Sequence, residues 1–174
     1  MVTGIVATLG AGAAFGSRLV QFEVPAVAVG QPAPAFEALT LGEQPQMRGL
    51  RDYPGQLVLL NIWATWCWPC QEEMPSIQKL HEEYGDQGLH VVAVSVDDPN
   101  QKRAIRDFIE EFGLTFEVLH DEAGAIMQAY QVLGLPESFL IDASGTIRDK
   151  SFIADWFSEE KRAIVEQFLP STES

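Results

Sequence analysis

The two cysteines of the chain, Cys67 and Cys70, are separated by two residues in the segment NIWATWCWPC. Two thiols at this spacing can form a structural disulfide, supply part of a metal site, or act as a redox couple. A disulfide that closes so short a loop restricts the unfolded chain far less than one that closes a long loop, so it adds little stability. The three histidines, His81, His90 and His120, have neither the spacing nor the grouping of a zinc motif. We therefore interpret the pair as a redox couple and predict no metal site.

The cysteine pair falls where a predicted buried strand meets a predicted helix. Residues 56–64, QLVLLNIWA, are almost continuously apolar, which is typical of a strand buried on both faces. Apolar residues recur at helical spacing in 69–85, and Gly85 is the expected C-terminal cap. A thiol at the start of a helix lies at the positive end of the helix dipole, where the thiolate is favoured. We therefore expect Cys67 to attack a client disulfide and Cys70, one turn into the helix, to resolve the mixed disulfide.

Strand and helix signals alternate along the rest of the chain. We expect strands at residues 36–41, 89–97 and 115–121, helices at 100–113, 123–130 and 158–169, and a hairpin of 138–142 with 146–152. Ser158 is the expected N-cap of the last helix. The sequence has no internal repeat and no sign of a second domain. The pattern therefore predicts one α/β sheet with helices on both faces.

Composition limits the kinds of partner. The chain has 174 residues, of which 47% are apolar, and a formal net charge of −14. This length and composition predict one compact domain with a full core. The acidic charge excludes nucleic acid as an expected partner, because the protein would repel phosphate. Basic or neutral partners are favoured.

The amino terminus differs in composition from the rest of the chain. From Met1 to Ser17 there is no charged side chain, and glycine and alanine dominate. This stretch resembles a signal sequence or a weak membrane anchor, although it lacks a basic start, and a plain terminal extension is the alternative. We assign residues 1–30 to this segment and its linker, and residues 31–174 to the folded domain.

Two segments carry a resemblance to a known family. LVLLNIWATWCWPCQEEMP, together with YQVLGLPESFLIDASGTI, resembles the thioredoxin superfamily and, within it, the extracytoplasmic TlpA, ResA and DsbE-like thiol-disulfide oxidoreductases. The resemblance spans residues 30–169 and makes 31–174 a thioredoxin-like domain. It implies a thioredoxin fold of the α/β class, a central mixed β-sheet flanked by helices, with an N-terminal strand extension and a helix-strand insert at residues 99–120. It also implies a cis peptide bond before Pro136, which would pack against the dithiol.

The resemblance adds an acid to the expected site. Glu73 matches a buried glutamate of the ResA-like branch, whereas Asn61 stands where thioredoxin has a buried aspartate. Glu73 lies three residues after Cys70, on the same side of the predicted helix, and Glu72 points elsewhere. We expect Glu73 to be buried, to have a raised pKa, and to exchange a proton with Cys70.

The residues around the cysteines suggest a client-binding surface. Trp68 and Pro69 separate the cysteines, and an exposed Trp68 would contact a client peptide. Trp63 and Trp66 are expected to pack. The residues assigned to client binding are Trp66, Trp68, Pro69, Leu135 and Glu137, and catalysis is assigned to Cys67, Cys70, Glu73 and Pro136.

These observations predict a thiol-disulfide oxidoreductase that acts outside the cytoplasmic membrane with no cofactor beyond the Cys67–Cys70 disulfide. The resemblance implies a reductant in cytochrome c maturation, whose clients are cysteine-containing proteins such as apocytochrome c and whose electron donor is a membrane protein.

Two alternatives use the same dithiol. One is a copper(I)-binding chaperone, because soft thiolates suit that ion. Copper chaperones of the SCO type, however, have a CxxxC motif and a distant histidine, whereas the spacing here is CxxC. A thioredoxin-fold peroxidase is the other, although the Pro-x-x-x-Thr-x-x-Cys pattern of peroxiredoxins is absent from the chain.

Overall fold

The computed structural model describes residues 26–170. Residues 1–25, which contain most of the predicted signal sequence or membrane anchor with its linker, lie outside the described residues. Val27 is buried, and the backbone N–H of Gly30 donates to the Ile147 carbonyl at 2.8 Å. Within the described residues, Val27 and Gly30 therefore already contact the folded domain. Within residues 26–170, no helix has both the length and the apolar composition needed to cross a bilayer.

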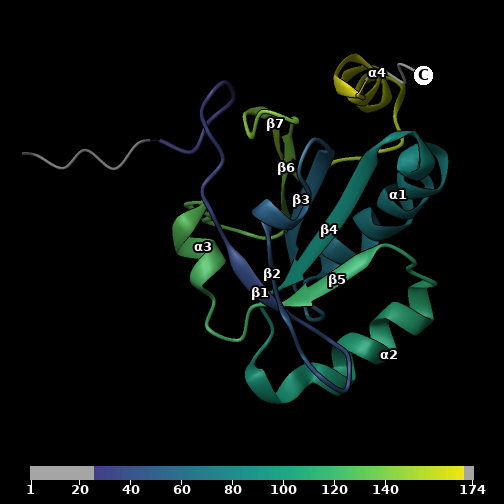
Figure 1. The fold of residues 1–174 in the computed structure, drawn as a ribbon. Helices are drawn as coiled ribbons and strands as arrows, with labels where there is room; N and C mark the ends of the chain where they lie inside the picture. The colour runs from purple at the N-terminus through teal and green to yellow at the C-terminus, as the bar shows by residue number, and fades with distance from the viewer. Residues whose placement is uncertain (1–25, 171–174) are drawn as a thin grey trace, which may run out of the picture.

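A mixed sheet forms the centre of the molecule. Its strands are β1 Glu37–Thr40, β2 Met47–Gly49, β3 Leu57–Trp63, β4 Leu89–Ser95, β5 Glu117–His120, β6 Glu137–Ile141 and β7 Ile147–Phe152. The seven strands follow the order β2-β1-β5-β4-β3-β6-β7 (Figure 1). β3, β4 and β5 are parallel, whereas the other strands pair antiparallel with their neighbours. The predicted mixed sheet and its amino-terminal strand extension are confirmed.

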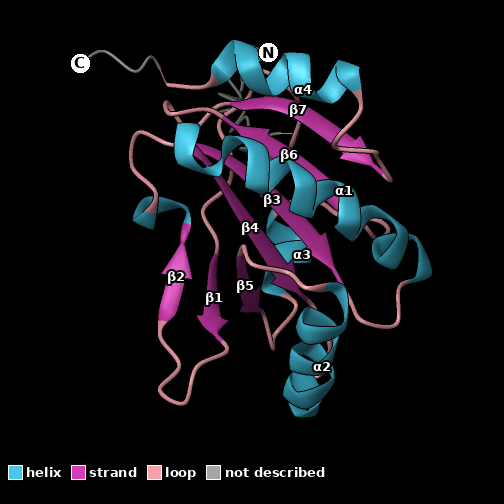
Figure 2. Ribbon diagram, turned by 90° about the vertical axis from the view of Figure 1, so that its right-hand side faces the viewer, coloured by secondary structure: helices cyan, strands magenta, loops and turns pink. Residues whose placement is uncertain are grey.

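Helices cover both faces of this sheet. They are α1 Trp68–Tyr84, α2 Lys102–Phe112, α3 Ala125–Ala129 and α4 Glu159–Phe168, with short 3₁₀ turns η1 Leu50–Asp52, η2 Gly85–Gln87 and η3 Pro99–Gln101. α1, α2 and α4 pack on one face, and α3 lies on the other (Figure 2). The predicted helix-strand insert is present as α2 and β5, and β5 lies between β4 and β1. Ser158 caps α4 as predicted, since its side chain accepts a hydrogen bond from the Lys161 backbone N–H.

β3 leads the chain from the core to the cysteine pair. All of its residues are buried, because Leu59 and Trp63 face α1 while Leu60 and Ile62 face α3. Successive side chains of a strand point to opposite faces, so a strand covered on both sides has an almost continuous apolar run. The predicted central strand is therefore confirmed, and α1 starts shortly after it.

One local feature, β2, differs from the prediction, and the end of α1 adds detail to it. β2 is a three-residue strand that the sequence pattern does not predict, since so short a segment shows no period. Gly85 is the C-cap of α1, as predicted, but it keeps helical angles, φ −56° and ψ −47°, and the chain continues through η2 to Gly88. Gly88 has a φ of 104°, and a Cβ there would lie 2.6 Å from the ring of Pro170. The residue that turns the chain is therefore Gly88, where both the backbone angle and the close packing require glycine.

Candidate active site

Cys67 and Cys70 form a disulfide at the start of α1, with Cα atoms 5.3 Å apart. Cys67 is the N-cap residue, and its Sγ accepts a hydrogen bond from the Cys70 backbone N–H at 3.2 Å. Pro69 lies in the first turn, where a missing N–H costs no helical hydrogen bond. Cys67 keeps 5% of its surface exposed and Cys70 none, so an incoming sulfur atom can reach only Cys67.

Asp97, which follows β4, holds the turn between β3 and α1. Its carboxylate accepts hydrogen bonds from the Thr65 backbone N–H at 2.9 Å and from the Thr65 hydroxyl at 2.6 Å. The Ser95 hydroxyl donates a third at 2.7 Å. Asp97 is buried, and these charge-assisted bonds replace its lost hydration. Because Ser95 and Trp63 are register partners, the ends of β4 and β3 meet here, and Asp97 fixes the backbone just before Cys67.

The loop before β6 reaches the same edge of the sheet. The Leu135–Pro136 peptide bond is cis, as the resemblance implies. Glu137 pairs in register with Ile62, so Pro136 lies beside the end of β3 from which the chain turns toward Cys67. Pro136 is buried, and Leu135 packs against both sides of the core.

Glu73 lies one turn after Cys70 on the buried side of α1. Its Oε1 accepts hydrogen bonds from Trp156 Nε1 at 2.7 Å and from Ser138 Oγ at 3.4 Å. Asn61 Nδ2 donates to Ser138 Oγ at 2.8 Å, which connects β3 to the same group. Burial raises the pKa of Glu73 to about 7, although the hydrogen bonds from Trp156 and Ser138 oppose the rise. Glu73 is thus buried, as predicted, and titrates near neutral pH.

The tryptophans beside the cysteines divide into one core residue and two surface residues. Trp63 is fully buried, with its ring 4.6 Å from that of Phe108. Trp68 is 67% exposed and Trp66 is 70% exposed. The expectation that Trp66 packs is wrong, because it lies in the turn between β3 and α1, where no other described element covers it. Its assignment to the client-binding surface stays a prediction.

Further apolar side chains are exposed on neighbouring loops. Phe152 ends β7 in register with Glu137, which places it at the edge of the sheet where β3 ends. Its ring lies against Gly134, where an added Cβ would be 3.1 Å away. A pocket of about 300 Å³ lies here, lined by Leu133, Phe152 and the ion pair of Glu137 with Lys150 at 3.2 Å. We define the apolar rim as the exposed residues Trp66, Trp68, Leu133, Phe152 and Ile153.

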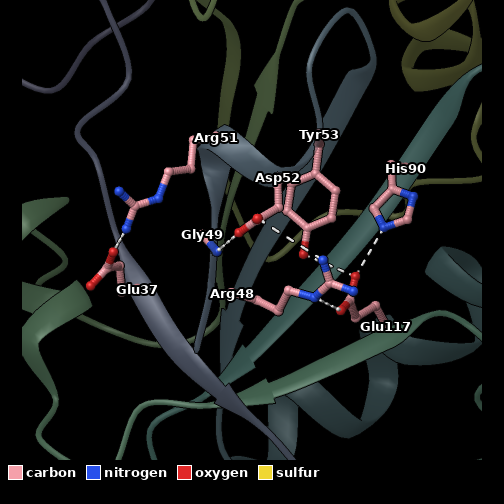
Figure 3. A network of polar contacts seen from close by, with 8 residues as sticks. All are labelled: Glu37, Arg48, Gly49, Arg51, Asp52, Tyr53, His90 and Glu117. Carbon is pink, nitrogen blue, oxygen red and sulfur yellow. Dashed lines mark hydrogen bonds and ion pairs between the residues drawn. The ribbon is translucent and has the colours of Figure 1, made fainter. Parts of the chain in front are cut away.

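His90 belongs to a polar network at the other end of the sheet. Its Nε2 lies 3.1 Å from Glu117 Oε2, and its ring stacks on Tyr53 with centroids 4.5 Å apart. Glu117 also accepts a hydrogen bond from the Tyr53 hydroxyl at 2.9 Å and faces Arg48 at 3.8 Å (Figure 3). The network therefore links the β2–η1 segment to β4 and β5, and it takes no part in the cysteine site.

The other two histidines have partners other than the cysteines. His81 lies edge-on to Phe116, and burial lowers its pKa. His120 is buried, and its Nε2 lies 2.8 Å from the Asp97 carbonyl oxygen. Within residues 26–170, no three His, Cys, Asp or Glu side chains are grouped so that they could hold a metal ion.

Comparison with known proteins connects this geometry to a family. Residues 29–150 match the AhpC/TSA family. The thiol-disulfide oxidoreductase ResA of Geobacillus kaustophilus (strain HTA426) is 42% identical over 126 residues, which cover 72% of this chain and 70% of that protein. The chain belongs to the AhpC/TSA family. It is a thiol-disulfide oxidoreductase with a thioredoxin fold, of the TlpA, ResA and DsbE-like branch.

Further relatives of the oxidoreductase agree with this assignment. The thioredoxin-like protein YneN of Bacillus subtilis (strain 168) is 41% identical over 121 residues, 69% of each chain. A crystal structure assigned as the thiol:disulfide interchange protein DsbE from Chlorobium tepidum has a TM-score of 0.67 and 29% identity, covering 80% of this chain and 94% of that one. These names favour dithiol exchange over the copper chaperone and peroxidase alternatives. Client proteins of the oxidoreductase accordingly contain cysteines.

The fold of the oxidoreductase places Cys67, Cys70 and Glu73 at the start and in the first turns of α1, and Pro136 beside the end of β3. His81 and His90 lie elsewhere, whereas His120 contacts Asp97 at the same end of the sheet. Sequence reasoning misses Asp97, Ser138 and Trp156. Asp97 had a detectable signal, because a polar side chain directly after a parallel strand lies at the edge where α/β proteins build their sites. Ser138 and Trp156 had none, because only the fold places them beside Glu73.

Proposed function

We propose that this oxidoreductase reduces disulfides in client proteins outside the cytoplasmic membrane, with Cys67 as nucleophile and Cys70 as resolving thiol. The supporting observation is the contrast between the two cysteines. Cys67 caps α1 at an accessible edge, whereas Cys70 is fully buried one turn into the helix. The free N–H groups of the first turn favour a thiolate at Cys67.

The reaction uses both thiols in order. The Cys67 thiolate attacks a client disulfide, so that a Cys67–client bond forms and one client thiolate leaves. Cys70 then gives its proton to Glu73, and the Cys70 thiolate attacks Cys67 Sγ. The Cys67–Cys70 bond forms, the Cys67–client bond breaks, and the second client thiolate leaves and takes up a proton. Two electrons pass to the client, and a donor protein must supply two electrons to reduce the enzyme again.

The proposed clients are the CxxCH segments of apocytochrome c, and the proposed electron donor is a membrane protein. Both follow from the resemblance to the TlpA, ResA and DsbE-like branch. The net charge of −14 supports a basic client, because complementary charge speeds the encounter of two proteins. The apolar amino-terminal stretch supports a position at the outer face of the cytoplasmic membrane, as an anchor or a cleaved signal.

The apolar rim is the proposed client-binding surface, together with Pro69, Leu135 and Glu137. Its side chains lie in the turn before α1, at the start of α1, in the loop before β6 and at the end of β7. Aromatic and aliphatic side chains that remain exposed at one edge provide the apolar centre that protein interfaces use. A client segment would place its cysteine at Cys67 and an apolar side chain against Leu133 and Phe152.

The equilibrium potential of the dithiol tests the direction of electron flow. The purified protein is equilibrated with glutathione redox buffers, and the Cys67–Cys70 disulfide is quantified by thiol labelling and mass spectrometry. We expect a potential of about −270 mV or lower, which is the range of reductants. A value near −120 mV, the range of strong oxidants, would contradict the proposal. Cys70→Ser is the control, because it cannot form the intramolecular disulfide.

A further inference from the structure

Two neutral donors from different elements hold one oxygen of Glu73. Trp156, between β7 and α4, donates its indole N–H to Oε1 at 2.7 Å, and Ser138 of β6 donates its hydroxyl to the same atom at 3.4 Å. Trp156 is fully buried. An indole N–H can donate but cannot accept, so Oε1 is an acceptor in both protonation states of Glu73.

The second oxygen of Glu73 has a different environment. Oε2 is buried and has no hydrogen-bond partner within residues 26–170. When Glu73 is protonated, its proton therefore resides on Oε2, because Oε1 already faces two donors. Glu73 and Cys70 are three residues apart, so their side chains leave the same face of α1. Oε2 is thus the atom through which Glu73 can take up or release a proton.

Trp156 is itself fixed against α1. Its backbone N–H donates to Ser76 Oγ at 3.0 Å, and Ser76 Oγ donates to the Glu73 carbonyl at 2.8 Å. The ammonium group of Lys161 lies 5.0 Å from the centre of the indole ring, within the range of a cation–π contact. Both the backbone and the ring are therefore held, and the fold sets the direction of the indole N–H.

Charged groups also face Glu73. The ammonium of Lys161, on α4, favours the carboxylate form, but it is shared with Asp149 of β7, 2.7 Å away. An open pocket of about 460 Å³ borders Glu73, and its charged lining residues are Glu72, Lys79 and Asp155. Because the cation is shared, neutral hydrogen-bond donors stabilise the buried carboxylate: Trp156 above all, then Ser138 and the backbone N–H of Ala154.

We propose that Trp156 is a positioning residue, which holds Oε1 of Glu73 and so directs Oε2 to the proton that Cys70 releases during resolution. This role deepens the disulfide reduction proposed above and rests on it. In that step the Cys70 thiol gives its proton to Oε2 of the Glu73 carboxylate. The Cys70–Cys67 bond then forms, and the Cys67–client bond breaks with release of the client thiolate. Removing the indole N–H would destabilise the carboxylate and raise the pKa of Glu73.

Trp156→Phe tests this role, and Trp63→Phe is its matched control. Trp63 is equally buried, but its indole N–H has no partner among the described residues. The readout is the titration of the ¹³C-labelled Glu73 carboxyl group by NMR, with a midpoint near pH 7 in the parent. We expect Trp156→Phe to raise this midpoint by about one pH unit, and Trp63→Phe to leave it in place. An unchanged midpoint in Trp156→Phe, or an equal shift in both variants, would overturn the role.

Kinetics provide a second readout. The client is a disulfide-linked dimer of a single-cysteine peptide, and release of its second thiol reports resolution in a single turnover. With the midpoint one unit higher, Trp156→Phe should resolve the adduct roughly fivefold more slowly at pH 7 and recover at higher pH. A resolution rate that is lowered equally at every pH would show that Trp156 acts only as a packing residue.

The parent protein allows a test without any variant. The indole N–H resonance of Trp156 should shift with the same midpoint as the Glu73 carboxyl group, and that of Trp63 should not. A Trp156 resonance that is independent of pH would overturn the positioning role alone. A parent that reduces no client at any pH would instead overturn the proposed function, so the two failures are distinguishable.

Discussion

Glu73 is the residue whose chemistry depends most on the tertiary structure. On an isolated helix it would be a hydrated glutamate, but β6 and the segment before α4 remove it from water and supply Ser138 and Trp156 as donors. Burial raises its pKa to about 7, so it can exchange a proton at neutral pH. The acid absent at Asn61 is thereby replaced by one placed on α1, close in sequence to the resolving thiol.

Replacing Glu73 by Gln keeps the side-chain shape and removes the titration. The folded parent holds this proton up to about pH 7, whereas the unfolded chain releases it at about pH 4.3. The unfolding free energy of the parent therefore falls as pH rises through this window, by about 4 kcal/mol at about 1.4 kcal/mol per pH unit. We expect Glu73→Gln to avoid this loss. Urea denaturation of both oxidised proteins between pH 5 and pH 8 measures the difference.

The matched control for this stability experiment is Glu72→Gln, which removes the same charge from an exposed position on the same turn. The pH-dependent difference in unfolding free energy between Glu72→Gln and the parent should be much smaller than that between Glu73→Gln and the parent. A constant difference between Glu73→Gln and the parent across the range would show that Glu73 is not a buried acid with a raised pKa.

At the scale of elements, the turn of residues 64–67 and the loops beside it combine rigidity with exposed apolar surface. Asp97 holds Thr65 by two hydrogen bonds, which fixes the approach to Cys67. The register of β3, β6 and β7 brings Phe152 to the same edge. The nucleophile is thus presented on a fixed turn, at the end of the sheet where Phe152 of the apolar rim also lies.

Leu133→Ser and Phe152→Ser test the apolar rim as a client-binding surface. Partial burial of one such side chain against a client contributes about 1 kcal/mol, so each variant should lower kcat/KM for the peptide client about fivefold. Reaction with dithiothreitol, which needs no such surface, should be unchanged. Met47→Ser is the control, because Met47 is also exposed but lies on β2, beyond β1 and β5 from the active-site strands. Equal effects of all three substitutions would exclude a specific role for the rim.

At the scale of the whole molecule, local sequence patterns predict the helices and strands, but they do not predict contacts between distant segments. The apolar run of β3 and the helical spacing of α1 are local, and both elements are found near their predicted bounds. The bond between Trp156 and Glu73 joins positions 83 residues apart, and no local pattern reports such a pair. For Trp66 the local pattern gives a wrong expectation. A large aromatic residue in an apolar segment suggests packing, yet Trp66 lies in a turn that leaves it exposed.

The order of the two thiols is the central claim, and trapping a mixed disulfide tests it most directly. Cys70→Ser and Cys67→Ser are reduced, separately mixed with the disulfide-linked dimer of the single-cysteine peptide, and analysed by intact mass without reductant. We expect Cys70→Ser to accumulate an adduct with one peptide, because Cys67 attacks and nothing resolves the bond. Cys67→Ser should form none, because Cys70 is fully buried. Equal adduct in both variants, or adduct only in Cys67→Ser, would contradict the assignment of nucleophile and resolving thiol.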